Sequence, residues 1–309
     1  MSLLIPTRQD HFDAHGHSDD DVKYIELLTQ SKQTHPEHYQ WDFQPIKGFF
    51  KQTEPDTDDM TFRYTQDHFG ILKPWPEIIS HLNHLNKTAG SNERYILFFL
   101  ARHGEGWHNI AMRKYSRHEW HSKWSRLNSD DEISWGPDAD LTELGIEQAW
   151  ENHRAWKTQL MNGAPWPSRF YVSPLTRSIR THNITWKDTD VEILEGVRET
   201  IGLHPCNRRS QRSVIRDRFP NVVFPSEFQE VDEWFEEYRE TRECLHEQTI
   251  RINRVLQELF ENDNGDEIVC ITSHTGTIRS FLSVIGHRKF VIPTGGMIPV
   301  VVKGTKTTL

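Results

Sequence analysis

Three continuous apolar runs, each ending at a polar motif, constrain the fold of this chain more than any other feature. The runs are YILFFLA (95–101), RFYVS (169–173) and EIVCITS (267–273). An apolar run without alternation is typical of a parallel strand that is covered on both faces. In an open α/β sheet, ligands bind beyond the carboxyl ends of such strands. The polar residues that follow the three runs are therefore candidate site residues.

The segments between these runs have the pattern of helices, and together they predict the fold class. We expect α/β, a three-layer α/β/α sandwich with a mostly parallel central sheet, plus an N-terminal extension. The clearest helical stretches are expected within 141–160 and 230–260. We predict a catalytic domain over 91–309, and an N-terminal arm and extension over 1–90 that packs on this core. Residues 1–20 are polar and lack periodicity, which indicates a flexible arm.

The charge balance and the cysteines narrow the choice of partners. Acidic residues outnumber basic ones by 45 to 36, which gives a formal net charge of −9. No broad basic surface is left for a nucleic-acid backbone, so an anion must be bound by a few clustered arginines. No segment has the length and apolarity of a membrane span or a signal peptide, and the three cysteines favour a reducing compartment. We expect a cytoplasmic protein with a small ligand, without a nucleic-acid or membrane partner; the oligomeric state is not indicated.

The first polar motif combines Arg102 with His103 and Gly104, followed by Asn109. A nucleophilic imidazole beside a guanidinium suits phosphoryl transfer, because the arginine binds two phosphate oxygens while the nitrogen attacks in line. Gly104 is expected to let the backbone approach the anion closely. The tripeptide alone is a weak signal, so the other motifs of the chain must show whether it belongs to a phosphate site.

Further motifs supply that context. Arg177 follows the second run in SPLTRSIRT, and His274 with Thr275 follows the third. Glu199, within LEGVRETIG, adds a carboxylic acid in a loop. Each of these residues could instead have no catalytic role, as a surface arginine, a structural histidine or an ordinary acidic residue. Only their combination indicates a phosphate site.

In this order and spacing the motifs resemble the histidine phosphatase, or phosphoglycerate mutase-like, superfamily. The resemblance implies that His103 is the nucleophile and that Arg102 and Arg177 clamp the phosphate. It further implies Glu199 as proton donor and His274 as an additional phosphate ligand. Asn109 matches the family's phosphate-contacting asparagine, and DADLTELGIEQA (138–149) matches a helix start whose role is capping. Thr275 replaces the glycine that is common after the second histidine.

A closer resemblance is to the fungal phosphomutase-like proteins, and it spans about Ile46 to Val302. Its motifs are GFF and W.E before RHGEGWHN, and RET.G.H.C..R after it. In the last of these, His204, Arg208 and Arg209 are candidates for binding the rest of a substrate. The alternative for the two arginines is that they form surface ion pairs.

The resemblance implies a phosphatase that hydrolyses a small phosphorylated metabolite, a phosphate monoester, through a phosphohistidine on His103. Glu199 is expected to be kept protonated by burial near the dianion, and to serve as acid and then as base. No metal and no cofactor is required by this scheme. The alternatives are a phosphomutase with the same residues, a non-catalytic anion-binding protein on the same fold, and an enzyme acting on an anionic substrate that is not a phosphate.

Overall fold

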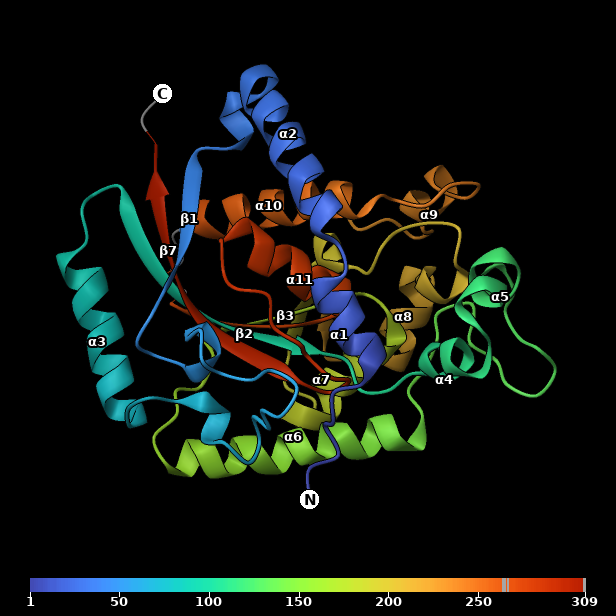
Figure 1. Ribbon diagram of the computed structural model, residues 1–309, viewed down its shortest axis with the longest axis horizontal. Helices are drawn as coiled ribbons and strands as arrows, with labels where there is room; N and C mark the ends of the chain where they lie inside the picture. The colour runs from blue at the N-terminus through green and yellow to red at the C-terminus, as the bar shows by residue number, and fades with distance from the viewer. Residues whose placement is uncertain (263–264, 266, 308–309) are drawn as a thin grey trace.

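One mixed sheet organises the molecule. The computed structural model describes residues 1–262, 265 and 267–307. In this part of the chain seven strands lie in the order β1-β7-β2-β6-β3-β4-β5 (Figure 1). The five strands from β2 to β5 in this order are parallel, whereas β7 runs antiparallel to both β1 and β2.

The elements have the following bounds. The strands are β1 (Trp41–Ile46), β2 (Glu93–Arg102), β3 (Arg169–Val172), β4 (Val191–Ile193), β5 (Val222–Val223), β6 (Ile268–Ser273) and β7 (Met297–Lys306). The helices are α1 (Arg8–His15), α2 (Ser18–Thr34), α3 (Trp75–Thr88), α4 (Trp107–Lys114), α5 (Arg117–Ser122), α6 (Glu143–Met161), α7 (Thr176–Trp186), α8 (Arg212–Arg218), α9 (Glu233–Glu237), α10 (Leu245–Glu261) and α11 (Thr275–Val284).

The alternation of buried side chains along β2 divides the core into two layers. Leu97 and Phe99 join one cluster, which holds apolar side chains of α3, α6 and α7. Ile96 and Phe98 point to the other face and join a cluster with α10 and α11. Since successive side chains of a strand face opposite sides, helices cover the sheet on both faces. Figure 1 shows α3 and α6 on one side of the sheet and α10 and α11 on the other. The predicted three-layer, mostly parallel fold is confirmed.

The three apolar runs form β2, β3 and β6, which are neighbours in the sheet. Because they are parallel, their carboxyl ends lie at one edge, where α4, α7 and α11 begin within five residues of the strand ends. The predicted helix after residue 141 is α6, and Thr142 caps it by accepting a hydrogen bond from the Gly145 N–H at 3.1 Å. The acidic stretch 230–260 forms two helices, α9 and α10, with a non-helical link between them.

The N-terminal segment differs from its prediction. Residues 1–20 are not a loose arm, because Thr7 and Asp10 form a capping box that starts α1. Leu4 is 2% exposed, and Asp10 is buried. The extension also supplies β1, which pairs with β7 at one edge of the sheet. The error arose because a short helix of polar residues carries no clear apolar period. No helix in the described residues has the length and apolar character needed to cross a membrane.

Candidate active site

The predicted site residues meet at the carboxyl edge of the sheet. His103 follows β2, His274 follows β6, and their ring centroids lie 5.1 Å apart. Both side chains are buried. Arg102 and Arg177 lie close enough to the His103 ring to lower its pKa. The fifth residue, Glu199, lies against the start of α11, where a side-chain carbon added to Gly276 would stand 2.3 Å from its Oε1.

His103 is held in one tautomer. Its Nδ1 lies 2.6 Å from the Gly104 carbonyl oxygen. A carbonyl only accepts, so Nδ1 carries the proton and Nε2 keeps a lone pair. Burial, with the nearby guanidinium groups of Arg177 and Arg102, holds the pKa of His103 well below its usual range. The ring is therefore neutral at pH 7, as attack on phosphorus requires.

The two ring nitrogens of His274 differ in their hydrogen bonding. Its Nε2 lies 2.7 Å from the Ser173 hydroxyl oxygen and 3.4 Å from that of Ser178. Its Nδ1 is buried and has no hydrogen-bond partner in the described part of the chain. A hydroxyl both donates and accepts, so the proton can sit on Nδ1 and be donated to an anion. A buried polar atom without a partner is costly, which favours a ligand at this position.

The two arginines are held differently. Arg102 donates from Nη1 to Asp10 Oδ1 at 2.5 Å and to the Ile292 carbonyl at 2.7 Å, so a buried carboxylate balances its charge. Arg177 donates only to neutral acceptors, namely the Cys206 carbonyl at 2.8 Å and Asn207 Oδ1 at 2.9 Å. It is fully buried, and no carboxylate among the described residues lies within salt-bridge distance of it. Arg177 therefore has no direct carboxylate partner among the described residues, although Glu199 and Asp138 are near enough to favour its charge.

Glu199 is surrounded by donors. Its Oε1 accepts from the Thr200 N–H at 3.0 Å and from the Gln248 amide at 3.3 Å. Burial alone would raise the pKa of Glu199, but the Thr200 N–H, Arg177 and Arg242 outweigh it and lower the pKa. Without a bound dianion, the hydrogen bonds and cations around Glu199 favour its charged form, so burial by itself does not keep this carboxyl protonated.

Two other acids, Glu105 near His103 and Glu195 near Glu199, are alternatives for the role of proton donor. Glu105 is bound by Arg113 and by the Thr142 hydroxyl. Glu195 pairs with Arg209 at 2.8 Å and also accepts from Arg198. Both carboxylates are already occupied by cations of the protein.

Comparison with known proteins identifies the family to which this site belongs. The family model described as histidine phosphatase superfamily (branch 1) matches residues 98–291. This chain belongs to the histidine phosphatase superfamily. The family's chemistry is phosphoryl transfer, and the resemblance stated from the motifs is confirmed.

Three fungal proteins are similar to this chain over most of its length. A probable phosphoglycerate mutase of Arthroderma benhamiae is 34% identical over 285 residues, which cover 84% of each chain. Phosphomutase-like protein 3 of Candida albicans is 33% identical, over 82% of this chain and 78% of its own. Probable phosphoglycerate mutase PMU1 of Saccharomyces cerevisiae is 30% identical, over 77% of this chain and 88% of its own.

Three predicted binding residues, Gly104, Asn109 and Thr275, also have structural roles at this edge. A Cβ at Gly104 would stand 2.3 Å from the Gly145 carbonyl oxygen, so packing against α6 by itself requires a glycine here. Asn109 closes the cap of α4 by accepting from the Gly106 N–H at 2.9 Å, which leaves its amide NH₂ for a ligand. Thr275 is the first residue of α11, where backbone N–H groups are unpaired within the helix.

Of the three candidate binding residues in the RET.G.H.C..R segment, only His204 remains a candidate. His204 is buried, and its ring lies 6.4 Å from that of His121 by centroids, beside the site. Arg208 is exposed and pairs with Glu236 at 2.7 Å, as the surface alternative predicted. Arg209 is 4% exposed and gives its donors to Glu195 and to carbonyl groups of the protein, so its predicted binding role is wrong. Its guanidinium joins two segments of the protein, one at Glu195 and the other at residues 229–231.

Two residues of the site were not predicted. Asp10 neutralises Arg102 from 92 positions away in the sequence. His108 is buried, and its ring centroid lies 5.3 Å from that of His103. Burial, Arg177 and His103 hold the pKa of His108 well below its usual range. The sequence signal for His108 was its place in the RHGEGWHN motif, as the second residue of α4; nothing local pointed to Asp10.

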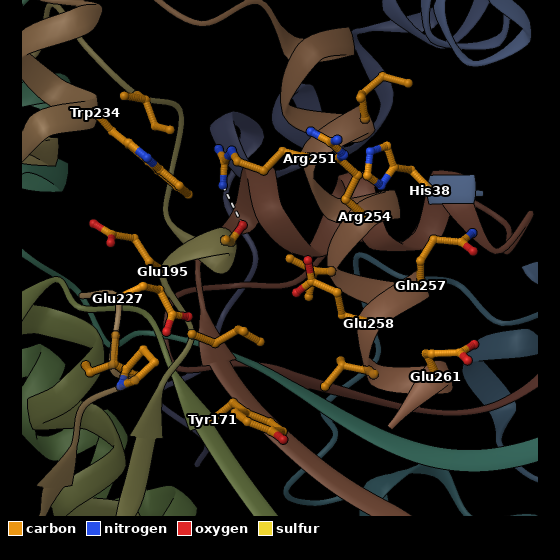
Figure 2. A pocket seen from close by; sticks show the side chains of 18 of the residues that line it. His38, Tyr171, Glu195, Glu227, Trp234, Arg251, Arg254, Gln257, Glu258 and Glu261 are labelled. Carbon is orange, nitrogen blue, oxygen red and sulfur yellow. Dashed lines mark hydrogen bonds between the residues drawn. The ribbon is translucent and has the colours of Figure 1, made fainter. Parts of the chain in front are cut away.

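A group of possible metal ligands and a large groove lie outside the candidate active site. In the part of the chain that the structure describes, the ligand atoms of His35, Glu37 and His38 lie within 4.8 Å of one another, but all three residues are exposed and none belongs to the site. A groove of about 1100 Å³ runs between α10 and the segment 192–196, and Figure 2 shows its lining. Nine of its lining residues are glutamates, so we call it the acidic groove.

Proposed function

We propose that this chain is a metal-independent phosphatase, which hydrolyses a small phosphate monoester through a phosphohistidine on His103. The observation that carries the proposal is the neutral, oriented His103 ring beside an arginine without a carboxylate partner, Arg177. Such a pair combines an available nucleophile with the positive charge that a phosphate dianion requires.

In the first half-reaction the phosphate binds between Arg102, Arg177 and the Nδ1 of His274. Nε2 of His103 attacks phosphorus, an N–P bond forms, and the ester P–O bond breaks on the opposite side. Glu199 gives its proton to the departing oxygen. A dianion beside this carboxylate raises its pKa by charge repulsion, so Glu199 gains its proton when the substrate binds.

In the second half-reaction a water molecule replaces the departed alcohol. Glu199, now a carboxylate, takes a proton from this water as its oxygen bonds to phosphorus. The N–P bond breaks, inorganic phosphate is released, and His103 returns to its neutral form. One carboxyl group therefore serves both steps, and the electron pair for each bond comes from the protein or from water.

A panel of phosphate esters tests the proposal. We expect release of inorganic phosphate at the same rate with and without EDTA, and no isomerised product. The relatives have mutase names, so each reaction is also analysed for movement of the phosphoryl group within the substrate. Isomerisation without net phosphate release would identify a phosphomutase, and neither product on any ester would identify an anion-binding protein.

We place this activity in the cytoplasm. The support is chemical: Cys206, Cys244 and Cys270 are all free thiols, as expected for a protein that works in a reducing compartment.

A further inference from the structure

Two histidines and a glutamate converge at one turn, outside the candidate active site. They are His35, Glu37 and His38, at the short 3₁₀ helix η1 (Pro36–His38) that joins α2 to β1. His35 Nδ1 lies 3.3 Å from Glu37 Oε1, and His38 Nε2 lies 3.4 Å from the same oxygen. One ligand atom from each residue lies within 4.8 Å of the other two. Three side chains of the types that bind metal ions therefore meet in one small space.

The distances between these side chains match the geometry of a tetrahedral zinc site. Zinc binds an imidazole nitrogen at about 2.0–2.1 Å and a carboxylate oxygen at about 2.0–2.2 Å, so two ligands of a tetrahedron stand about 3.3–3.5 Å apart. The two nitrogen-to-oxygen distances of 3.3 and 3.4 Å fall in this range. All three side chains are exposed, so rotation in solvent can bring the ring nitrogens to a common ion.

The turn holds the three residues together before an ion binds. The ring of Pro36 fixes its backbone angle at the first position of η1. The His38 N–H donates to the His35 carbonyl at 3.1 Å, and the Tyr39 N–H donates to the Pro36 carbonyl at 3.0 Å. Tyr39 is buried and anchors the end of the turn in the protein. Because the backbone is already ordered, binding costs less conformational entropy.

The electrostatic surroundings of the turn also favour a cation. Glu37 and His38 belong to the lining of the acidic groove, and Figure 2 labels His38 there. The other basic residues of this lining are Arg251 and Arg254, against nine glutamates. A hydrogen bond from its own backbone, together with His35 and His38, lowers the pKa of Glu37 and favours its carboxylate form. A cation therefore approaches the turn through a field that attracts it.

We propose that His35, Glu37 and His38 bind one zinc ion beside the acidic groove. Two imidazoles and one carboxylate suit a borderline-soft ion such as zinc, whereas Mg²⁺ and Ca²⁺ prefer oxygen ligands alone. Three protein ligands leave the fourth position of the ion to water. The site does not include His103, so the inference does not rest on the proposed function, and hydrolysis at His103 needs no metal.

A second pair of histidines, on α1, is less suited to zinc. The rings of His11 and His15 are stacked, with centroids 4.6 Å apart. His15 Nε2 is already engaged with Asp59 Oδ2 at 2.8 Å, and that oxygen also accepts from the Val291 N–H at 3.1 Å. Within the described residues, no other three metal-binding side chains bring their ligand atoms within 4.8 Å of one another. The ion is therefore assigned to the turn.

Calorimetric titration of the full-length protein with zinc chloride tests the assignment. We expect one ion per chain, bound more tightly than Mg²⁺. His38→Ala and Glu37→Gln should each weaken zinc binding by at least about tenfold, because even the hydrogen-bonding partners of metal ligands are worth about 10–100-fold. His11→Ala is the matched control, since it removes an exposed histidine of the other pair, and it should leave the affinity unchanged. Melting curves recorded without zinc check that each variant folds.

The position of the ion is measured by anomalous diffraction from crystals soaked in zinc chloride. A peak between the three side chains, absent from the double variant His35→Ala/His38→Ala, would support the site. Zinc binding that survives this double variant, or that is lost in His11→Ala, would overturn it. No zinc binding by the wild-type protein would show that the three side chains form ion pairs only. Equal affinity for Mg²⁺ and zinc would overturn the choice of ion.

Discussion

The candidate active site and the acidic groove lie on either side of one short segment but have opposite electrostatic character. Glu195 lines the groove, whereas Glu199 belongs to the site. In the site, Arg177 and Arg242 help to lower the pKa of Glu199. In the groove, burial and the neighbouring Glu227 raise the pKa of Glu258, and Arg254 offsets this only in part.

The comparison shows that the size of a hollow says little about phosphate binding. The groove has a volume of about 1100 Å³, yet its nine glutamates would repel a dianion. The site is a tighter arrangement of buried groups, and Arg177 there has no carboxylate partner among the described residues. With a net charge of −9, we expect the protein to bind an anion only where a cation has no carboxylate partner. The predictions below separate the two regions.

The largest effect is expected from loss of the nucleophile. His103→Ala should lower kcat/KM by about 10³-fold or more, because the covalent route is removed. Glu258→Gln, on the groove side, should leave phosphatase activity unchanged. Steady-state kinetics on a nitrophenyl phosphate measures both. Comparable activity of wild type and His103→Ala would show that catalysis does not take place at the candidate active site.

The next largest effect is expected at Arg177, which has no carboxylate partner among the described residues. Arg177→Lys keeps a positive charge but loses the planar, bidentate geometry, so we expect a loss of about 10²-fold in kcat/KM. The same change at the groove, Arg254→Lys, is the control, because Arg254 is exposed and lines the acidic groove. Circular dichroism melting curves check that both variants fold. Equal losses in the two variants would mean that Arg177 acts through stability and not through the phosphate.

Glu199→Gln should reveal its role by its dependence on the leaving group. An alkoxide needs a proton as it departs, whereas a nitrophenolate hardly does. The loss of kcat/KM on an alkyl phosphate should therefore exceed the loss on the nitrophenyl ester by about tenfold or more. Equal losses would indicate that Glu199 only positions the substrate.

No loss on either ester would move the proton donor to Asp13. Burial raises the pKa of this acid, and it lies in the field of Arg102 and Glu199.

The smallest effect is expected from Asp10→Asn, which keeps an acceptor for Arg102 but removes the charge. We expect the inhibition constant of inorganic phosphate to change by severalfold, toward tighter binding, because the Arg102 charge is no longer compensated. The free energy of unfolding should fall by about 1.5–3 kcal/mol with the loss of the charged hydrogen bond. An unchanged inhibition constant with lowered stability would make Asp10 a purely structural residue.

Much of the fold and of the site was predictable from residues that are close together in the sequence. The apolar runs identified β2, β3 and β6, and the motifs that follow them contain His103, Arg177 and His274. These predictions succeeded because strand ends of a parallel sheet converge at one edge, whatever the length of the connections.

Other features depend on contacts that no local pattern reveals. Asp10 reaches Arg102 from a short polar helix without a clear apolar period. Arg209 matched a motif, but its donors are used by carbonyl groups of the protein, which only the folded chain brings together. Arg242 belongs to none of the motifs, yet it contacts Thr200 and helps to lower the pKa of Glu199.

The central claim is that His103 carries the phosphoryl group, and rapid quenching tests it most directly. The wild-type protein is mixed with a phosphate ester, quenched in alkali within milliseconds, and digested for mass spectrometry. We predict an acid-labile, alkali-stable phosphate on the peptide that contains His103, and none on that peptide in His103→Ala. Turnover of the ester with no phosphate on this peptide, or with phosphate on His274 or His108 instead, would contradict the account.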